Sequence, residues 1–486
     1  MQQATILRSL GGKKMLLAVL ALSGIVHLVN VTGFPDIFYD EGIYMRRAMY
    51  LLDTGSPQDS GTFYDHPYFG QIFLGAVLGS IGYPSSLNPT ADPQSMEALY
   101  SVPRVLMGLL AIADTFLIYK IADVRYGRKV AIIASILFAV MPAMWLTRRI
   151  LLDNILLPFL LSSILLALYS RNAEEKSSKR TALVLLSGAA LGIAIFTKVP
   201  VFVFMPLVAS LVYTPKSKRL LALWLAPVVL IPMIWPAYSM SLGQFDYWQE
   251  GVLWQAQRES NGLLYITEIL FSTDPVLLVL GAAGAVLAAV LRDRFVLLWI
   301  VPFVLFLAVI GYMQYFYWIP ILPALCVAAG ILFAKVLSSR PKILAAAVAV
   351  VAAFGLASTL ALVTTNVTSA QYSAMAFLAT KIDDDTTFVA NPVYAWVLKS
   401  AFGNKNGFSD YRDLIYSPVR TDHTVVVAEG HFMSAIDDYD KLRNAYEKSG
   451  TIATFENDPG KPQTYPYTPL NYNWEGRTID IRASSN

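Results

Sequence analysis

Two adjacent carboxylates, Asp40 and Glu41, follow the first long apolar segment of the chain. They belong to the stretch FPDIFYDEGIYMRRAMYLL, in which Arg46 and Arg47 follow within two turns if the stretch is helical. Carboxylates favour the first turn of a helix, and a helix start explains one of the two acids better than both. The alternative is chemical: a general base or a metal-binding carboxylate beside a membrane segment.

Further ionisable residues stand at the ends of apolar segments, where charge is costly and commonly functional. They are Asp65, His66, Arg104, Arg148, Arg149, Asp153 and Lys198. Each has a simpler explanation as well. A turn before Pro67 explains Asp65 and His66, and an ion pair one helical turn apart explains Arg149 and Asp153. Long cationic side chains such as Arg104 can extend to lipid headgroups.

The composition indicates what surrounds these residues. Of 486 residues, 56% are hydrophobic and only 15% are charged, whereas soluble domains carry about 25% charged residues. The chain is therefore predicted to be a polytopic helical membrane protein. A net charge of +3 without a basic tract argues against nucleic-acid binding. The single cysteine, Cys326, excludes a disulfide framework and a cysteine-rich metal site.

Apolar segments of membrane-spanning length predict about eleven spans. They lie near 15–33, 101–122, 130–147, 154–170, 181–197, 199–213, 220–240, 273–291, 295–311, 316–335 and 343–363. The first could be a signal peptide, but a retained helix suits the many spans that follow. Basic residues mark every second short connection, which predicts a cytoplasmic N-terminus. The carboxylates and cations described above then share the outer face.

Longer segments outside the spans complete the predicted organisation. Within a transmembrane domain at 1–363, outer loops are expected at 34–100 and 241–272, with residues 68–83 as an interfacial or re-entrant helix. The region 364–486 alternates short apolar runs with one amphipathic segment, which predicts a small α/β domain. An odd number of spans would place this domain outside the cell membrane.

Six short motifs, in order along residues 34–335, resemble those of one enzyme family. They are YDEGIYMRRAMYLLDTG, FYDHPYFGQIFLG, SVPRVLMGLLAI, LTRRILLDNILLPFLL, LGIAIFTKVPVFVFMPL and YFYWIPILPALCVAAG. The chain resembles integral-membrane glycosyltransferases of the GT-C fold. Within that fold it is most similar to the dolichyl-phosphate-mannose–protein mannosyltransferases and the aminoarabinose–lipid A transferases. The tail after the last span carries no such motif.

The resemblance implies transfer of a sugar from a polyprenyl-phosphate donor to an acceptor hydroxyl or phosphate on a protein, glycan or lipid at the outer face. It implies inversion, with Asp40 as the general base. Glu41 and Asp153 would position the acceptor or hold a divalent ion.

The donor would be bound by a second group of residues in the same motifs. The resemblance implies that Arg104, Arg148, Arg149 and Lys198 bind the carrier phosphate. It also implies that His66 positions the donor or acceptor and that Tyr315 belongs to the donor-binding group. Gln314 stands where relatives commonly have a basic residue, so this part of donor binding differs. Asp65 could bind a metal, but the second outer loop contains no histidine to complete such a site. A divalent metal ion is therefore expected to be optional, and no other cofactor is implied.

Two other functions fit a polytopic chain. A transporter or lipid flippase would carry ionisable residues at mid-span depth and repeat symmetry, whereas the charges here gather at one interface. A membrane-anchored binding protein would need far fewer spans. Both are weaker interpretations than a glycosyltransferase.

Overall fold

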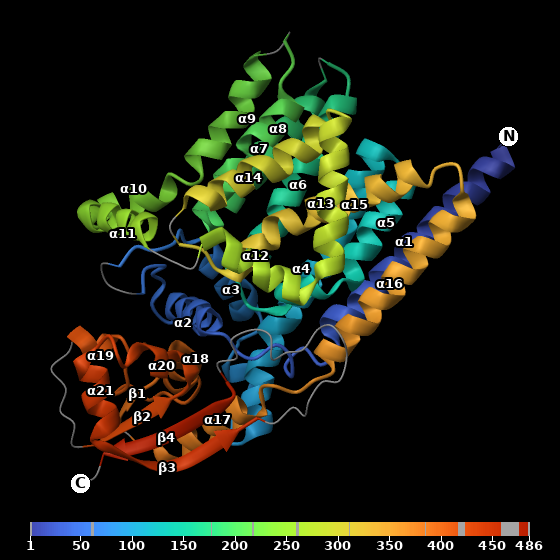
Figure 1. Cartoon of the computed structure of the whole chain (residues 1–486). Helices are drawn as coiled ribbons and strands as arrows, with labels where there is room; N and C mark the ends of the chain where they lie inside the picture. The colour runs from blue at the N-terminus through green and yellow to red at the C-terminus, as the bar shows by residue number, and fades with distance from the viewer. Residues whose placement is uncertain are drawn as a thin grey trace.

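A computed structural model describes residues 2–59, 63–175, 177–215, 218–258, 262–310, 312–383, 385–416, 423–457 and 476–484. Helices form one large body, and a small sheet with short helices lies against one end of it (Figure 1). The N-terminal helix and the last long helix of the bundle run side by side along one flank.

The helical body is built from the long apolar segments. Its α-helices are α1 (Gln2–Leu28), α4 (Pro93–Tyr126), α5 (Arg128–Val140), α6 (Leu152–Asn172), α7 (Ser178–Thr197), α8 (Met205–Val212), α9 (Lys218–Leu230), α13 (Pro275–Val290), α14 (Arg294–Val309), α15 (Leu322–Val336) and α16 (Pro341–Val363). Three 3₁₀ helices adjoin them: η2 (Pro142–Arg148), η3 (Val199–Phe204) and η4 (Tyr315–Ile321). Helices suit these segments because they satisfy their own backbone polar groups in lipid.

Each of the eleven apolar segments contains helix, but the presence of a helix does not establish that the segment crosses the membrane. In the described residues, five helices are long and apolar enough to cross a membrane, and eight crossings result if each bent pair counts as one. The bends are sharp: α5 and η2 meet at 68°, and α12 (Gly262–Thr273) and α13 meet at 117°. About eleven spans therefore stays a prediction.

The two ends of the bundle differ in chemistry. Asp153 and Arg171 lie at opposite ends of α6, roughly 27 Å apart at the rise of an α-helix. Arg125, Arg171 and Arg294, from three of the basic connections, surround one hollow. The basic connections thus converge at one end, while the sequence-predicted carboxylates gather at the other.

The long loops hold shorter helices. These are α2 (Tyr39–Thr54), α3 (Phe69–Ser80), the 3₁₀ turn η1 (Ser85–Leu87), α11 (Phe245–Gln257) and α12, whereas α10 (Ile234–Ser241) follows α9 at a bend of 41°. Helix α3 falls in the segment expected to be interfacial or re-entrant, and its 12 residues span only about 18 Å. That length is too short to cross a bilayer alone, although its position relative to lipid stays a prediction.

The C-terminal region contains a four-stranded sheet in the order β1-β2-β4-β3. Strands β1 (Thr387–Val389) and β2 (Thr424–Ala428) are parallel, and β4 (Thr478–Ser484) pairs antiparallel with β2 and with β3 (Ser449–Glu456). The helical elements here are α17 (Ser369–Lys381), α18 (Pro392–Trp396), the π-helical turn η5 (Val397–Ala401), α19 (Asp413–Tyr416), α20 (Gly430–Ala435) and α21 (Asp440–Glu447).

The C-terminal region shares its core with the helical body. The Trp396 ring lies 5.4 Å from that of Tyr100 in α4, and its indole nitrogen donates to the Tyr100 hydroxyl at 2.6 Å. Helix α2 passes so close to α18 that a Cβ at Gly42 would lie 2.2 Å from the Val393 nitrogen. Only glycine tolerates this approach, so Gly42 fixes α2 between the two bodies.

Candidate active site

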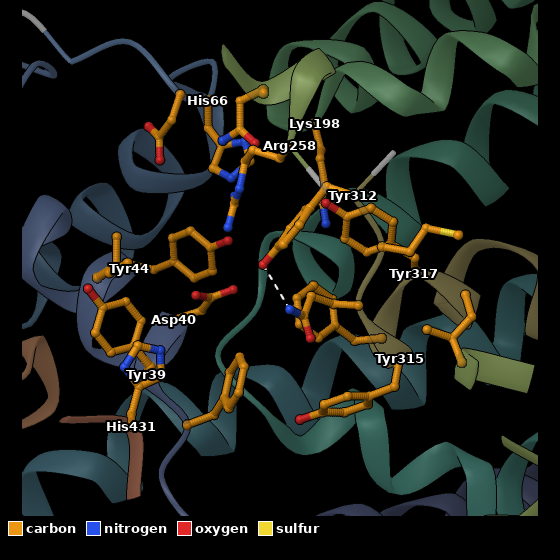
Figure 2. A pocket seen from close by; sticks show the side chains of 18 of the residues that line it. Tyr39, Asp40, Tyr44, His66, Lys198, Arg258, Tyr312, Tyr315, Tyr317 and His431 are labelled. Atoms are coloured by element: carbon orange, nitrogen blue, oxygen red, sulfur yellow. Dashed lines mark hydrogen bonds between the residues drawn. The ribbon is translucent and has the colours of Figure 1, made fainter. Parts of the chain in front are cut away.

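A cavity of about 320 Å³ opens where α2, α11, α12, η4 and the C-terminal region meet (Figure 2). Its lining is strongly polar and aromatic. The lining residues used below are Tyr39, Asp40, Tyr44, Asp65, His66, Lys198, Arg258, Tyr312, Tyr315, Tyr317, Arg412 and His431. They come from segments scattered over most of the chain.

Asp40 stands in the first turn of α2, and its carboxylate points into the cavity between Tyr44 and Tyr312 (Figure 2). It makes no hydrogen bond or ion pair with any residue that the structure describes. Burial raises the pKa of Asp40 to about 6, while the nearby cations Lys198 and Arg258 oppose this rise. At neutral pH the group is an ionised carboxylate with its oxygens available to accept a proton.

Glu41 faces away from the cavity and is fully buried. Its carboxylate accepts from Arg104 Nη2 at 2.8 Å, from Arg149 Nη1 at 3.1 Å and from the Ile150 nitrogen at 3.1 Å. Burial alone would raise the pKa of Glu41, but the two guanidinium groups outweigh it and lower the pKa. The structure therefore separates the adjacent acids, with one open to the cavity and one bound inside the protein.

Arg104, Arg148 and Arg149 do not line the cavity, where the sequence placed the carrier phosphate. All three are fully buried. The Arg148 guanidinium donates to four backbone carbonyls between residues 26 and 34, and Arg149 pairs with Asp36 at 2.7 Å. They turn inward because the segment 26–36 offers carbonyl and carboxylate acceptors that would otherwise be buried without donors.

Lys198 lies at the cavity wall and is bound to Asp153. Its Nζ is 2.7 Å from Asp153 Oδ2 and 4.0 Å from the centre of the Tyr317 ring. Asp153 is itself buried and does not line the cavity, so it orients the ammonium from behind. An aromatic face and one carboxylate together hold the cation at a fixed position beside the open space.

Arg258, which the sequence analysis did not select, supplies a second cation. It caps the end of α11, and its guanidinium carbon lies 3.4 Å from the centre of the Tyr312 ring. No carboxylate of the described residues lies within ion-pair distance of it. Arg258 lies in the segment 241–272 that the sequence predicts to be an outer loop, where an arginine runs against the positive-inside bias, and that criterion would have identified it.

His66, Asp65 and Tyr315 line the cavity as well. Burial lowers the pKa of His66 to about 4, so the ring is neutral at pH 7. Asp65 Oδ1 is 2.7 Å from Arg47 Nη2. Burial would raise the pKa of Asp65, but the Arg47 guanidinium outweighs it and lowers the pKa.

The described residues do not fit the optional metal ion. Among them no group of three or more His, Cys, Asp and Glu side chains is arranged to hold a metal. Asp65, the residue singled out for that role, is already bound to an arginine. No chemical step below therefore passes through a metal.

The C-terminal region forms the remaining wall, which no sequence motif indicated. The His431 ring stacks on Tyr39 at 4.0 Å with the planes 7° apart, and burial lowers the pKa of His431 to about 4. Arg412 pairs with Asp410 at 2.9 Å and hydrogen-bonds the Tyr39 hydroxyl. These side chains present a neutral imidazole and a fixed guanidinium to the cavity.

A second hollow, of about 210 Å³, adjoins the cavity on the side of the helical body. It shares six residues with the cavity: Asp65, His66, Lys198, Gln255, Tyr312 and Tyr317. The rest of its lining is mainly apolar: Val199, Pro200, Phe202, Trp235, Val252, Ala256, Phe306 and Ile310. An apolar groove therefore meets the polar cavity at Lys198.

Comparison with known proteins gives one family and one fold. The family model for dolichyl-phosphate-mannose-protein mannosyltransferase matches residues 21–248. No curated protein sequence matches the chain.

Two solved structures share the fold at low sequence identity. AglB from Archaeoglobus fulgidus, an archaeal oligosaccharyltransferase in complex with an inhibitory peptide and a dolichol-phosphate, has a TM-score of 0.58 at 12% identity. The match covers 99% of this chain and 77% of that one. ArnT from Cupriavidus metallidurans, bound to undecaprenyl phosphate, has a TM-score of 0.58 at 13% identity, over 96% of this chain and 97% of that one.

These matches confirm the resemblance predicted from the sequence. The two structures establish the fold over nearly the whole chain, and the family model covers the segment that carries Asp40 and Lys198. The chain therefore has the GT-C fold, and its residues 21–248 are similar to the dolichyl-phosphate-mannose-protein mannosyltransferases.

Proposed function

We propose that this chain transfers a sugar from a polyprenyl-phosphate donor to an acceptor at the outer face of the membrane, with Asp40 as the general base. One observation carries the proposal. An ionised carboxylate without a partner among the described residues faces two cations in a cavity that joins an apolar groove. Dolichol-phosphate and undecaprenyl phosphate in the solved relatives have the matching chemistry, an apolar tail that ends in a phosphate.

The donor would bind across the junction of the groove and the cavity. Its isoprenoid chain would lie along Phe202, Trp235 and Phe306, and its phosphate would meet Lys198 and Arg258. Both cations are held by aromatic rings, so they need little rearrangement to accept a doubly charged leaving group. Preorganised charge of this kind stabilises the transition state more than the ground state.

In the proposed reaction Asp40 takes the proton from the acceptor hydroxyl. The acceptor oxygen then forms a bond to the anomeric carbon, while the bond from that carbon to the phosphate oxygen breaks. The electron pair leaves with the polyprenyl phosphate, whose added charge Lys198 and Arg258 would neutralise. Attack opposite the leaving group inverts the anomeric centre. No metal is needed to balance this step.

The acceptor would approach from the wall that the C-terminal region forms. Asp40 lies between that wall and the groove, so a donor in the groove leaves the space beside Tyr39, Arg412 and His431 open. A neutral imidazole and a guanidinium can both donate hydrogen bonds to acceptor oxygens. The buried arginines of the sequence prediction and Glu41 are assigned to structure, because they do not line the cavity.

The test is sugar transfer by purified Asp40→Asn protein in lipid nanodiscs. Candidate polyprenyl-phosphate sugars are supplied with acceptor extract, and mass spectrometry measures the released carrier and the modified product. We expect a rate about 10²- to 10⁴-fold below wild type, the contribution typical of a general base. The matched control is Asp53→Asn, since Asp53 is an exposed acid on the same helix and does not line the cavity.

Near-wild-type transfer by Asp40→Asn would refute the assignment of the base. The same assay decides against a transporter or lipid flippase. Those proteins would move the sugar lipid across the bilayer without releasing free carrier, whereas a transferase releases one carrier for each sugar transferred.

A further inference from the structure

A hollow outside the proposed active site lies at the opposite end of the bundle. Its volume is about 570 Å³, and it opens where the α4–α5, α6–α7, α8–α9 and α13–α14 connections converge. Four arginines line it: Arg125, Arg171, Arg292 and Arg294. The rest of the lining is mainly apolar, with Val124, Leu168, Leu211 and Phe295 beside the polar Asn172 and Ser210.

The positive charge of this hollow is largely uncompensated. Arg125 is 3.5 Å from Asp293 Oδ1, and its guanidinium carbon is 5.8 Å from the centre of the Phe295 ring. Among the described residues, no carboxylate lies within ion-pair distance of Arg171, Arg292 or Arg294. Three guanidinium groups therefore surround a space without an anion to neutralise them, while the fourth is held in place.

The backbone at Arg292 forms the turn that ends α13. Its φ is 53°, in the left-handed region that ordinarily belongs to glycine or asparagine after a helix. Helix α13 ends there, with the Arg292 and Asp293 nitrogens donating to the Ala289 and Ala288 carbonyls. Glycine would form this turn with less strain than arginine.

We propose that this hollow binds an anionic membrane phospholipid through the phosphate group of its headgroup. Arginine is suited to this because its planar fork donates two hydrogen bonds to one phosphate. Basic pockets between membrane helices are known to take phospholipid headgroups.

The positive-inside bias alone explains the sign of these charges but not their arrangement. That bias is satisfied by basic residues anywhere near the helix ends, as at Arg219 and Arg340, which do not line the hollow. The lining arginines, which are exposed as well, instead come from three separate connections and surround one space. Val290 and Leu291, beside the turn, are 74% and 50% exposed and would lie against the acyl chains.

The experiment measures lipid binding to the purified full-length chain in neutral detergent by native mass spectrometry. The probes are dioleoyl phosphatidylglycerol and dioleoyl phosphatidylcholine, each titrated separately. We expect the anionic lipid to bind at least about tenfold more tightly, the effect of one charge-assisted contact. The double variant Arg292→Gln/Arg294→Gln should lose about tenfold or more of that affinity, and the matched double variant Arg219→Gln/Arg340→Gln should keep it.

A competition with glycerol phosphate separates the two sources of the phosphate. Displacement of the lipid at millimolar glycerol phosphate would identify a site for soluble phosphates, and persistence of the lipid would identify a lipid site. The proposal is overturned if the two double variants bind phosphatidylglycerol equally, or if phosphatidylcholine binds as well as phosphatidylglycerol.

Arg292→Gly guards against a trivial loss of folding. Glycine relieves the left-handed backbone, so this variant should unfold at or above the wild-type temperature. It should nevertheless bind phosphatidylglycerol more weakly than wild type. A stable Arg292→Gly protein with unchanged lipid affinity would remove Arg292 from the site.

Discussion

Replacing Glu41 by glutamine should destabilise the fold far more than replacing its neighbour Asp40 by asparagine. The Glu41 carboxylate accepts five hydrogen bonds, three from the guanidinium groups of Arg104 and Arg149 and two from the Phe38 and Ile150 nitrogens. Asp40 accepts none from the residues that the structure describes. The two substitutions remove the same charge from adjacent positions, so their difference isolates these contacts.

The magnitude follows from the geometry at each oxygen. Oε2 receives Arg104 Nε and the Ile150 nitrogen, and Oε1 receives the other three donors. Whichever oxygen becomes an amide NH₂, at least two donors then face another donor instead of an acceptor. Each buried donor left without a partner costs about 1–3 kcal/mol, and breaking a buried ion pair costs about 3–5 kcal/mol. We expect a loss of about 3–5 kcal/mol for Glu41→Gln.

The assay is reversible unfolding in mixed dodecyl maltoside and SDS micelles, followed by circular dichroism. The folded-to-unfolded ratio of Glu41→Gln should fall about 10²- to 10⁴-fold, as that free energy implies. Asp40→Asn should stay within about 1 kcal/mol of wild type, because burial already disfavours its charged form. A loss below about 1 kcal/mol for Glu41→Gln would refute the structural assignment of this residue.

The remaining predictions concern the cavity. Because the pKa of Asp40 is raised to about 6 and a base must be ionised, initial transfer rates should fall about tenfold per pH unit below pH 6, and a flat profile would contradict this. Arg258→Gln should raise the donor KM about tenfold, with partial rescue by Arg258→Lys, in steady-state assays. Lys198→Met should lower the free energy of unfolding by about 3 kcal/mol, because it leaves Asp153 buried and unpaired. Adding Asp153→Asn should restore stability, measured by unfolding, but not donor affinity. Arg412→Gln should raise the acceptor KM and leave the donor KM unchanged, and an equal effect on both would remove it from the acceptor wall.

The different roles of Asp40 and Glu41 follow from helix geometry. Successive residues of a helix point about 100° apart, so two adjacent acids cannot face the same space. Asp40 shares its direction with Tyr44, four residues on, and both line the cavity. Helix geometry therefore predicts that only one of the two acids can face the cavity. The sequence of α2 does not predict which of its faces lies at the cavity, because that depends on how α18 packs against Gly42.

The arginines were harder to place because their side chains are long. Arg148 and Arg149 stand at the end of an apolar segment, where a side chain can reach outward to a ligand or inward to backbone carbonyls. The inward partners lie in residues 26–36, more than a hundred positions away in the sequence. No local pattern distinguishes the two directions.

Strands of the C-terminal sheet illustrate the same limit. The runs at β1, β2 and β3 were expected because they alternate or are continuously apolar. Strand β4 was not expected, although it lies inside the sheet between β2 and β3. Its Asp480 and Arg482 interrupt the apolar pattern, and their side chains instead bond to Thr454 and Ser449 of the neighbouring strand.

Only part of the proposed site lies within the segment that the family model matches. Residues 21–248 contain Asp40 and Lys198, the groups that we assign to the base and to the phosphate. Arg258 and the acceptor wall at Arg412 and His431 lie beyond that range. The chemistry shared with a family must reside in the shared segment, whereas recognition of a particular acceptor can reside outside it. We therefore expect the C-terminal wall to determine which acceptor this chain uses. Its shared core with α2 and α4 also means that point variants test this role more cleanly than removal of residues 364–486.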